Sequence, residues 1–489
     1  MLKYTGHPLV DVGIATILAF VGKNDPATLT EADLDKVADY IADQYTRQPL
    51  KSFLTVAFMN SGFTQPAFEA MPERRREYAS RVLRSYRADT PTLDEQCVFT
   101  GLPATNIIFN DRDNLPAGRA FRQHIPLITG VDVINFHPYG DAGLPVSGLA
   151  LLAIQAFPLG CGKAEGRLLA VHSDSADVTL YFARVFLQRN MAEISLAQQA
   201  NSTKLGESSR SPKTLVIDTL VEASAEQLLA RIEDGRFLSI TVYHLGGGQN
   251  PALDIYELPS QLIHFLADMN RPQYTGAWHA LVRDAWETEP RTGRRSRQAD
   301  EPFRPRRNWL YEDFFQLPLN AHVFVRKYFL HHAWQSTHAM SVARRSDEPT
   351  LLLLHYWPLT ARFLERILNM DQDRINRIRE LADQLADYVS NNNDRAFFRA
   401  LYTADKYPIL RNEIIKVDYN NARQGNGPIV TFDQFVEVFG NWDEANRFGY
   451  WLFARDLLLI RMIERLQEWL PRNREALPVE SGDAEAAES

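Results

Sequence analysis

The chain has 489 residues, of which 45% are hydrophobic and 23% charged, and it carries a net charge of −8 at neutral pH. This length favours two or three domains, and the composition excludes a disordered or fibrous protein. Two cysteines are too few for a disulfide framework. No apolar run is long and uncharged enough to span a bilayer, and the N-terminus lacks the basic start of a signal peptide. We therefore expect a cytoplasmic protein with no membrane partner, on which any nucleic-acid surface is a local basic patch.

Two helices are predicted near the N-terminus. The first covers residues 30–46, where Thr30 and Asp33 have the spacing of a capping box before an apolar pattern of helical period. The second covers residues 71–87 and carries five arginines in "RRREYASRVLR". From 97 to 170 the chain changes to glycine- and proline-rich loops with short apolar runs.

Strands are predicted after this loop-rich region. Residues 213–221 ("KTLVIDTLV") and 237–245 ("FLSITVYHL") are rich in β-branched residues, and "LDIYELP" follows a glycine-rich turn. A helix is predicted at about 221–234, between the first two strands. Residues 291–307 contain seven arginines, and their two prolines exclude a long helix.

The C-terminal part is predicted to be helical. From Leu351 the chain shows helical periodicity up to "ARDLLLIRMIERLQEWL", and after Pro471 it becomes an acidic tail. The predicted fold class is α+β, with a large mixed N-terminal body that includes an irregular, loop-rich region, followed by a C-terminal helical bundle. The corresponding domains are residues 1–350 and 351–471, with a disordered acidic tail at 472–489.

No enzyme motif is present in the chain. It lacks the phosphate-binding, zinc-protease, serine-hydrolase and dinucleotide-binding signatures. His172 and Asp174 in "VHSDS" could suggest proton transfer, but no nucleophile is paired with them by spacing, and the pattern is that of a strand end and turn. These observations favour a binding or scaffold protein, and we do not expect an enzyme.

The two cysteines lie in similar turns. Cys97 occurs in "QCVFTGLPATN" and Cys161 in "PLGCGKAEGRLL". Each is followed three residues later by a poor metal ligand, Thr100 and Ala164 respectively. The frame is therefore that of two metal knuckles in which half of the ligands are missing.

Six segments follow one another as they do in a known family. They are "GHPLVDVGIATILAF" at 6–20, "FMNSGF" at 58–63, "CVFTGLPA" at 97–104, "NFHPYGDAGLPVSG" at 135–148, "LLAIQAFPLGCGKAEGRLLAVHSD" at 151–174 and "ITVYHLGGGQNPALDIYELP" at 240–259. With "ARDLLLIRMIERL" in the helical part, the similarity runs over most of the chain. On these segments the chain resembles the CXXC-CXXC family of CRISPR-associated proteins, the large subunit of type I-B Cascade.

The resemblance implies two C-x-x-C knuckles, whose four thiolates suit tetrahedral zinc. In this chain both knuckles are degenerate, at Cys97 with Thr100 and at Cys161 with Ala164. The prediction is no cofactor, since two thiolates are too few for a structural zinc. His124 or His172 could still complete the set.

The resemblance also implies a function and partners. Members of the family are non-catalytic subunits of an RNA-guided surveillance complex, which recognise the protospacer-adjacent motif in duplex DNA, stabilise the opened R-loop and present the complex to a downstream effector. The expected partners are the guide CRISPR RNA complex with the backbone and foot subunits of Cascade, target double-stranded DNA, and a nuclease-helicase or a transposition machinery. The C-terminal bundle resembles the small subunit of such complexes. Met340 offers an internal start for a separate copy that would fold alone.

The sequence offers candidate DNA-binding residues of two kinds. Small polar side chains suited to reading the motif are Asn60, Ser61, Thr105 and Asn106. Basic side chains suited to the nucleic-acid backbone are Arg74, Arg75, Lys163, Arg167, Arg294, Arg295, Arg306 and Arg307. Both basic segments also have an interpretation without DNA binding. The arginines of 71–87 could pair with Glu73 and Glu77, and residues 291–307 could be a solvated linker.

One alternative function stays open at this point. The chain could be a metal-independent enzyme with its site in the loop-rich 97–174 region and a helical regulatory domain. Co-purification of guide RNA with several partner proteins would separate the two readings.

Overall fold

The structure is a computed structural model. It describes residues 2–110, 115–128, 142–222, 239–247, 251–288, 303–343, 355–440 and 450–473, except for the side chains of 338–343. The chain forms two compact units, which we call the mixed unit (Met1–Ile263 with Glu287–Phe315) and the helical unit (His264–Trp286 with Gln316–Ser489). The predicted α+β class is confirmed, because small antiparallel sheets occur in the N-terminal half and the C-terminal region consists of helices.

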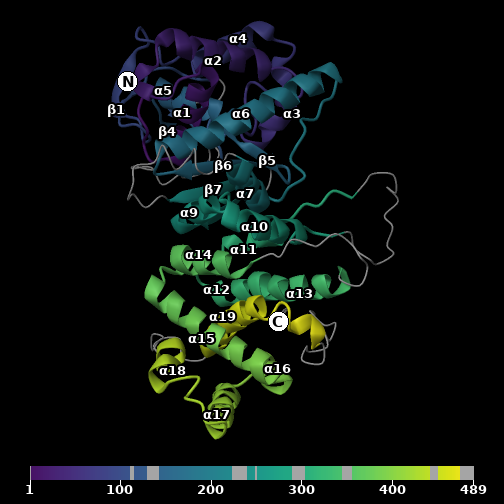
Figure 1. The fold of residues 1–489 in the computed structure, drawn as a ribbon. Coiled ribbons are helices and arrows are strands. Elements are labelled where there is room, and N and C mark those ends of the chain that lie inside the picture. Colours follow the sequence, from purple (N-terminus) through teal and green to yellow (C-terminus); the bar gives the residue numbers. More distant parts are fainter. Residues whose placement is uncertain are drawn as a thin grey trace. The chain divides into compact units, whose positions relative to one another are not determined.

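The mixed unit is built around helix α1 (Pro8–Val21), which is buried along most of its length. Helices α5 (Gly148–Ala156) and α6 (Ala176–Gln199) pack against it (Figure 1). A Cβ atom at Gly13 would overlap the backbone of Ala153, so glycine allows the backbones of α1 and α5 to meet. The glycine in "VDVGIA" is therefore a packing residue.

The remaining helices of the mixed unit lie around this centre. They are α2 (Glu31–Gln44), α3 (Leu50–Phe53), α4 (Pro72–Leu83), α7 (Pro212–Glu222) and α11 (Trp309–Phe314). The predicted capping box starts α2: the Asp33 N–H donates to the Thr30 hydroxyl (3.3 Å), and the Thr30 N–H donates to the Asp33 carboxylate (3.0 Å). The helices predicted at 30–46 and 71–87 are thus confirmed.

Four antiparallel strands form the main sheet in the order β5-β6-β7-β8. Their bounds are β5 (Gly162–Ala164), β6 (Arg167–Ser173), β7 (Ile240–Gly246) and β8 (Ala252–Leu258). Two small two-stranded sheets pair β1 (Thr92–Gln96) with β2 (Pro103–Thr105) and β3 (Arg119–Ala120) with β4 (Leu144–Pro145). The strands predicted at 237–245 and in "LDIYELP" are confirmed as β7 and β8.

The strand predicted at 213–221 is wrong, because these residues form α7. Its threonines, valine and isoleucine suggested a strand, yet Pro212 occupies the first helical position, where proline is favoured. Most of the helix is buried on several sides, which erases the polar face that marks a surface helix. From residue 223 onward, the helix predicted at 221–234 lies outside the described residues.

The helical unit begins before residue 351, the boundary suggested by the sequence. Helix α9 (Ser260–Asp268) leads into it from the mixed unit. Its helices are α10 (Pro272–Asp284), α12 (Ala321–Phe324), a π-helical turn (Val325–Leu330), α13 (His331–Ala343), α14 (Trp357–Leu368), α15 (Gln372–Asn392), α16 (Arg395–Thr403), α17 (Tyr407–Arg423), α18 (Phe432–Phe439) and α19 (Tyr450–Arg465).

An aromatic cluster joins the two parts of the helical unit. The ring of Phe363 on α14 stacks on Phe324 at 5.1 Å between centroids and meets Phe329 and Phe265 edge-on, at 5.3 and 5.8 Å. All four rings are buried. Helix α14 therefore depends for its core contacts on residues that precede Met340.

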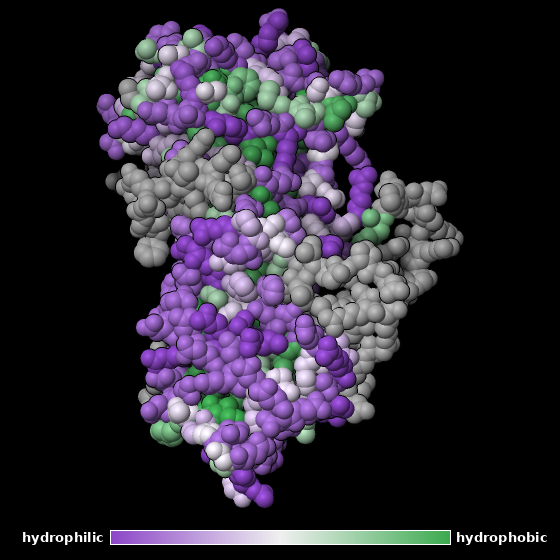
Figure 2. All heavy atoms as spheres, in the orientation of Figure 1, coloured by the Kyte–Doolittle hydropathy of each residue, from purple (hydrophilic) through white to green (hydrophobic). Residues whose placement is uncertain are grey.

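The surface carries few large apolar areas on the face shown in Figure 2, where hydrophilic residues predominate. Within the described ranges, every helix is too short or too polar to cross a bilayer. Most of the predicted acidic tail, from residue 474, lies outside those ranges.

Candidate nucleic-acid interface

The first knuckle turn is closed by hydrogen bonds. Cys97 is buried directly after β1; its N–H donates to the Leu102 carbonyl (2.7 Å), and its carbonyl accepts from the Gly101 N–H (2.9 Å). The Thr100 hydroxyl lies 3.1 Å from the hydroxyl of Ser147, the N-cap of α5. The side chain of Thr100 thus ties the turn to the start of α5.

The second knuckle turn is the start of a β-hairpin. The Cys161 thiol donates to the Phe157 carbonyl (3.2 Å), and burial raises its pKa well above the usual range, which keeps the thiol neutral. Ala164 ends β5, and its carbonyl accepts a hydrogen bond from His244 Nε2 (3.0 Å). The position three residues after Cys161 is thus held by Ala164, whose side chain has no donor atom for a metal.

The side chains around these turns do not fit a tetrahedral zinc site. Over the described part of the chain, no three His, Cys, Asp or Glu side chains are grouped so as to hold a metal. His124 is buried between Tyr78, Phe109 and Phe121, and burial lowers its pKa to about 3. It is therefore a neutral side chain within an aromatic cluster of the core. His172, the other histidine considered, is engaged elsewhere.

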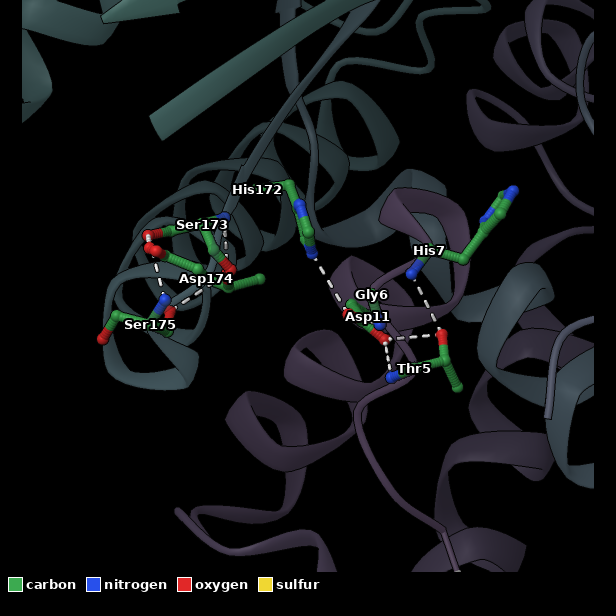
Figure 3. A network of polar contacts seen from close by, with 9 residues as sticks. Thr5, Gly6, His7, Asp11, His172, Ser173, Asp174 and Ser175 are labelled. Carbon is green, nitrogen blue, oxygen red and sulfur yellow. Dashed lines mark hydrogen bonds and ion pairs between the residues drawn. The ribbon is translucent and has the colours of Figure 1, made fainter. Parts of the chain in front are cut away.

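His172 pairs with Asp11, a buried carboxylate on α1, and not with Asp174 (Figure 3). The His172 Nε2 lies 3.1 Å from Asp11 Oδ2. The same carboxylate accepts the Thr5 N–H (2.7 Å), the Thr5 hydroxyl (3.0 Å) and the Gly6 N–H (2.8 Å). Asp174 instead accepts hydrogen bonds from the Ser173 hydroxyl and a backbone N–H of the chain before β7.

The pKa of Asp11 reflects two opposing effects. Burial alone would raise the pKa of the carboxyl, but the hydrogen bonds from His172, Thr5 and Gly6 outweigh burial and lower it. Asp11 is therefore a carboxylate that fastens the N-terminal segment and β6 to α1. The sequence held one signal for this pair, since an acid inside an apolar helix needs a partner.

The candidate motif-reading residues divide into exposed and buried ones. Asn60 and Asn106 are exposed, and Asn60 has a left-handed backbone (φ 60°) that turns the chain sharply. Ser61 and Thr105 are buried. Burial of both side chains does not favour the prediction that Ser61 and Thr105 read bases, whereas the two asparagines reach solvent.

Helix α4 contacts both asparagine loops through its side chains. The Ser61 hydroxyl lies 3.5 Å from the Tyr78 hydroxyl, and the Phe63 ring meets the Tyr78 ring edge-on at 5.2 Å. At the other loop, Arg81 Nη1 donates to the Ile108 carbonyl (3.2 Å). Helix α4 thus connects the loop of Asn60 with the loop of Asn106.

The arginines of α4 differ in their availability. Arg76 pairs with Glu73, and Arg81 pairs with Glu77 (2.5 Å), as expected if these arginines form ion pairs within their own helix. Arg74 lies over the ring of Phe68, 5.3 Å from its centroid, and no acid is paired with it in the described structure.

Arg75 is the most unusual cation of this helix. Its Nε and one Nη atom are buried, and no described group accepts a hydrogen bond from either. Lys51 lies near it, and burial followed by repulsion from Arg75 lowers the pKa of this lysine. Lys51 forms an ion pair with Glu69, whereas Arg75 has no such acid of its own among the described residues. Two cations with a single acid leave a local excess of positive charge beside α4.

The two cations near the second knuckle turn are engaged within the protein. Lys163 Nζ donates to the Leu205 carbonyl (3.0 Å) and lies over the Phe53 ring, and burial lowers its pKa. Arg167 pairs with Asp254 at 2.7 Å. Neither matches the prediction of a cation presented to a nucleic-acid backbone.

A cavity of about 540 Å³ adjoins Lys163, between β5, α6 and α7. Its ion pairs join Arg189 to Glu222 (2.7 Å) and Arg210 to Asp218 (3.4 Å). Burial raises the pKa of Asp218. The charged groups of this cavity thus largely neutralise one another, which does not favour an anionic ligand.

The arginine-rich segment is described only from residue 303. Arg294 and Arg295 lie outside the described residues. Arg306 is exposed and pairs with Glu165 at 2.9 Å, while Arg307 is exposed and lies over the Trp309 ring, 5.7 Å from its centroid. Arg307 keeps its charge at the surface and remains a candidate for phosphate.

Comparison with protein-family models, with curated proteins and with solved structures found no match for this chain.

Proposed function

We propose that this protein is the non-catalytic large subunit of an RNA-guided CRISPR type I-B surveillance complex. In this role it recognises the protospacer-adjacent motif in duplex DNA, stabilises the opened R-loop and presents the complex to a downstream effector. The observation that carries the proposal is the arrangement at α4, where two loops with one exposed asparagine each contact the same arginine-bearing helix.

This arrangement has the two parts that motif recognition needs. Asparagine amides donate and accept hydrogen bonds in one plane, which suits the edge of a base. Arg74 carries a charge that no described acid neutralises by direct pairing, which suits phosphate. Arg75, whose Nε and one Nη are buried without an acceptor among the described residues, adds to the positive potential of the same helix. Phosphate contacts would set the register of the DNA, and the asparagines would discriminate its sequence.

The six segments on which the resemblance rests meet in the core of the mixed unit. All six resembling segments contribute buried side chains to one hydrophobic cluster, although they span residues 6–259. Val12, Phe58, Cys97, Val146, Leu168 and Leu245 represent the six segments in that cluster. Segments that pack together are constrained together, which is consistent with one shared fold.

The proposal includes the partners that such a subunit needs. These are a guide CRISPR RNA complex with backbone and foot subunits, target duplex DNA, and a nuclease-helicase or transposition machinery. A cytoplasmic location belongs to the same proposal.

The enzyme alternative has one observation in its favour, the pair formed by His172 and Asp11. An imidazole fixed by a buried carboxylate is a common part of proton-transfer sites. Here the carboxylate also holds the N-terminal segment through three further hydrogen bonds, which favours a structural role. Substituting His172 by Gln would separate the two: an enzyme loses turnover, whereas DNA binding by the complex is retained.

Affinity purification and DNA binding test the proposal. The tagged chain should recover guide RNA and several partner proteins, and Asn60→Ala or Asn106→Ala should relax the preference for one motif by about 1–3 kcal/mol per lost base contact. Arg75→Ala should weaken binding to all sequences and reduce the salt slope by about one, while the matched Arg76→Ala, already paired with Glu73, should not. Purification of the chain without RNA, together with equal effects of Arg75→Ala and Arg76→Ala, would reject the proposal.

A further inference from the structure

Strand β8 forms the edge of the main sheet. It pairs with β7 along its whole length, from Ile240 opposite Leu258 to Gly246 opposite Ala252, without a break in register. Within the described ranges, no strand pairs with its other side. Every second N–H and C=O group of an edge strand points outward, so β8 presents a row of backbone donors and acceptors at β spacing.

The exposed side chains of β8 continue an apolar face of the sheet. Leu253 is 46% exposed and Ile255 53% exposed. They lie opposite Leu245 and Tyr243 on β7, which pack on the core of the mixed unit. Glu257, two positions beyond Ile255, is exposed on the same face, because side chains alternate along a strand.

This edge lacks several of the devices that usually prevent strand addition. Lysine, proline and bulges protect edge strands, and β8 ("ALDIYEL") contains none of them, although Pro251 and Pro259 flank it. Its charged side chains are two acids, Asp254, which pairs with Arg167, and Glu257. A regular edge with exposed leucine and isoleucine promotes association. The shape of such an edge favours one occupant, a further strand.

We propose that the β8 edge binds an extended segment of a partner protein. The segment has apolar residues at two alternate positions, opposite Leu253 and Ile255, and a basic residue two positions further on, opposite Glu257. This interaction surface is separate from the DNA-binding surface proposed at α4. Partner binding at β8 does not depend on DNA binding at α4. Binding adds a fifth strand to the sheet and covers the two apolar side chains.

A second copy of this chain fits the edge less well. If two β8 strands paired in antiparallel fashion about Ile255, each Glu257 would lie opposite the Leu253 of the other copy. A charge would then be placed against an apolar side chain twice in one short ladder. The charge of Glu257 thus favours a basic partner strand over self-association.

The test uses the full-length chain and three synthetic peptides. Thr-Lys-Thr-Val-Thr-Val-Thr carries the proposed pattern in antiparallel order; the second peptide has Glu in place of Lys, and the third has the composition of the first with the two valines adjacent. Binding is followed by residue-resolved hydrogen exchange of the β8 amides. We expect the first peptide to protect the outward-facing amides and to bind about tenfold more tightly than the second, with the third weaker than the first.

Charge reversal and matched controls sharpen the test. Glu257→Lys should reverse the preference between the first two peptides, and Ile255→Lys should weaken binding of the first by about tenfold. Leu196→Lys, at a 59% exposed leucine on α6, should change nothing. Unchanged exchange of the β7 amides in each variant shows that the sheet is intact.

Four outcomes would overturn the proposal. Equal binding of the Lys and Glu peptides would refute the role of Glu257 in selecting a basic partner. A lack of protection of the β8 amides by any peptide would refute strand addition. Outward-facing β8 amides that are already protected in the free monomer would show that this chain covers its own edge. If the wild-type chain sediments as a dimer and the Ile255→Lys variant as a monomer, the edge is covered by a second copy of the chain.

Discussion

Two of the buried aspartates, Asp11 in the mixed unit and Asp268 in the helical unit, are stabilised differently. Asp11 in the mixed unit accepts hydrogen bonds from two backbone N–H groups, a hydroxyl and His172. Asp268 in the helical unit is surrounded by three arginines: Arg362 (2.5 Å), Arg366 (3.1 Å) and Arg271 (2.9 Å). Both carboxylates connect segments that are distant in the sequence.

The difference between these partners determines how each unit responds to change. Arginine stays charged at any ordinary pH, so removing Asp268 leaves neighbouring cations without their acid. The partners of Asp11 are neutral or titratable, so its contribution depends on the ionisation of the carboxyl itself. Equivalent substitutions in the two units are therefore expected to differ in size and in pH dependence.

The largest effect is expected from a fragment that begins at Met340. It lacks Asp268, Phe265, Phe324 and Phe329, so Phe363 loses its ring partners and two arginines of α14 lose the buried acid that they share. Loss of such aromatic packing costs roughly 3–5 kcal/mol at a single site. Contrary to the sequence-based expectation of independent folding, we predict that residues 340–489 show no cooperative melting by circular dichroism.

A longer fragment supplies the control for this prediction. Residues 316–489 retain Phe324 and Phe329 and should melt more cooperatively than 340–489. A sharp, reversible transition of 340–489 alone would contradict the prediction and would restore the idea of an independently folded small subunit.

The substitution Asp268→Asn should have the next largest effect. It should lower the free energy of unfolding of the helical unit by about 2–4 kcal/mol, because Arg362 is mostly buried and loses its main acid. Denaturant titration with hydrogen exchange of α14 measures the change. Glu365→Gln removes a more exposed partner of the same arginine and should cost less than about 1 kcal/mol; equal losses in the two variants would refute the argument.

The substitution Asp11→Asn should have a smaller effect that depends on pH. Because the pKa of Asp11 is lowered in the folded state, its stabilising contribution is complete above the unfolded value of about 4 and is lost as the pH falls through the folded pKa. We expect a loss of about 2 kcal/mol at neutral pH, which starts to shrink near pH 4 and vanishes only below the lowered pKa of the folded state.

Hydrogen exchange of α1 and β6 against pH measures the effect of Asp11→Asn. Asp174→Asn is the matched control, since this exposed aspartate beside His172 in the sequence does not bind it. A pH-independent loss in Asp11→Asn, or an equal loss in Asp174→Asn, would be inconsistent with the assigned roles.

The smallest effect is expected at the first knuckle turn. Thr100→Val removes the hydroxyl that contacts Ser147 and should cost about 1 kcal/mol, whereas Thr55→Val, at an exposed threonine, should cost less than half of that. Elemental analysis of wild type and variant should find far less than one zinc per chain. A stoichiometric zinc that is lost in Cys97→Ser would contradict the structural reading of both turns.

The sequence by itself predicted the elements whose signals are local. The capping box of α2, the arginine helix α4 and the strands β7 and β8 follow from neighbouring residues, since caps, alternation and helical periodicity depend on positions a few residues apart. The same rules did not predict helix α7. Burial on several sides removes the alternation of apolar and polar faces on which these rules depend.

Only the tertiary structure decided which candidate residues are available. Asn60 and Ser61 are neighbours in the sequence, yet one is exposed and the other buried. His172 lies two positions from Asp174 and binds Asp11, 161 residues away. Arg75 and Arg76 are successive residues on α4. Arg76 pairs with an acid, whereas no described group accepts a hydrogen bond from two buried nitrogen atoms of Arg75. Exposure and pairing depend on what the folded chain brings within a few ångströms, and local sequence carries no information about such distant contacts.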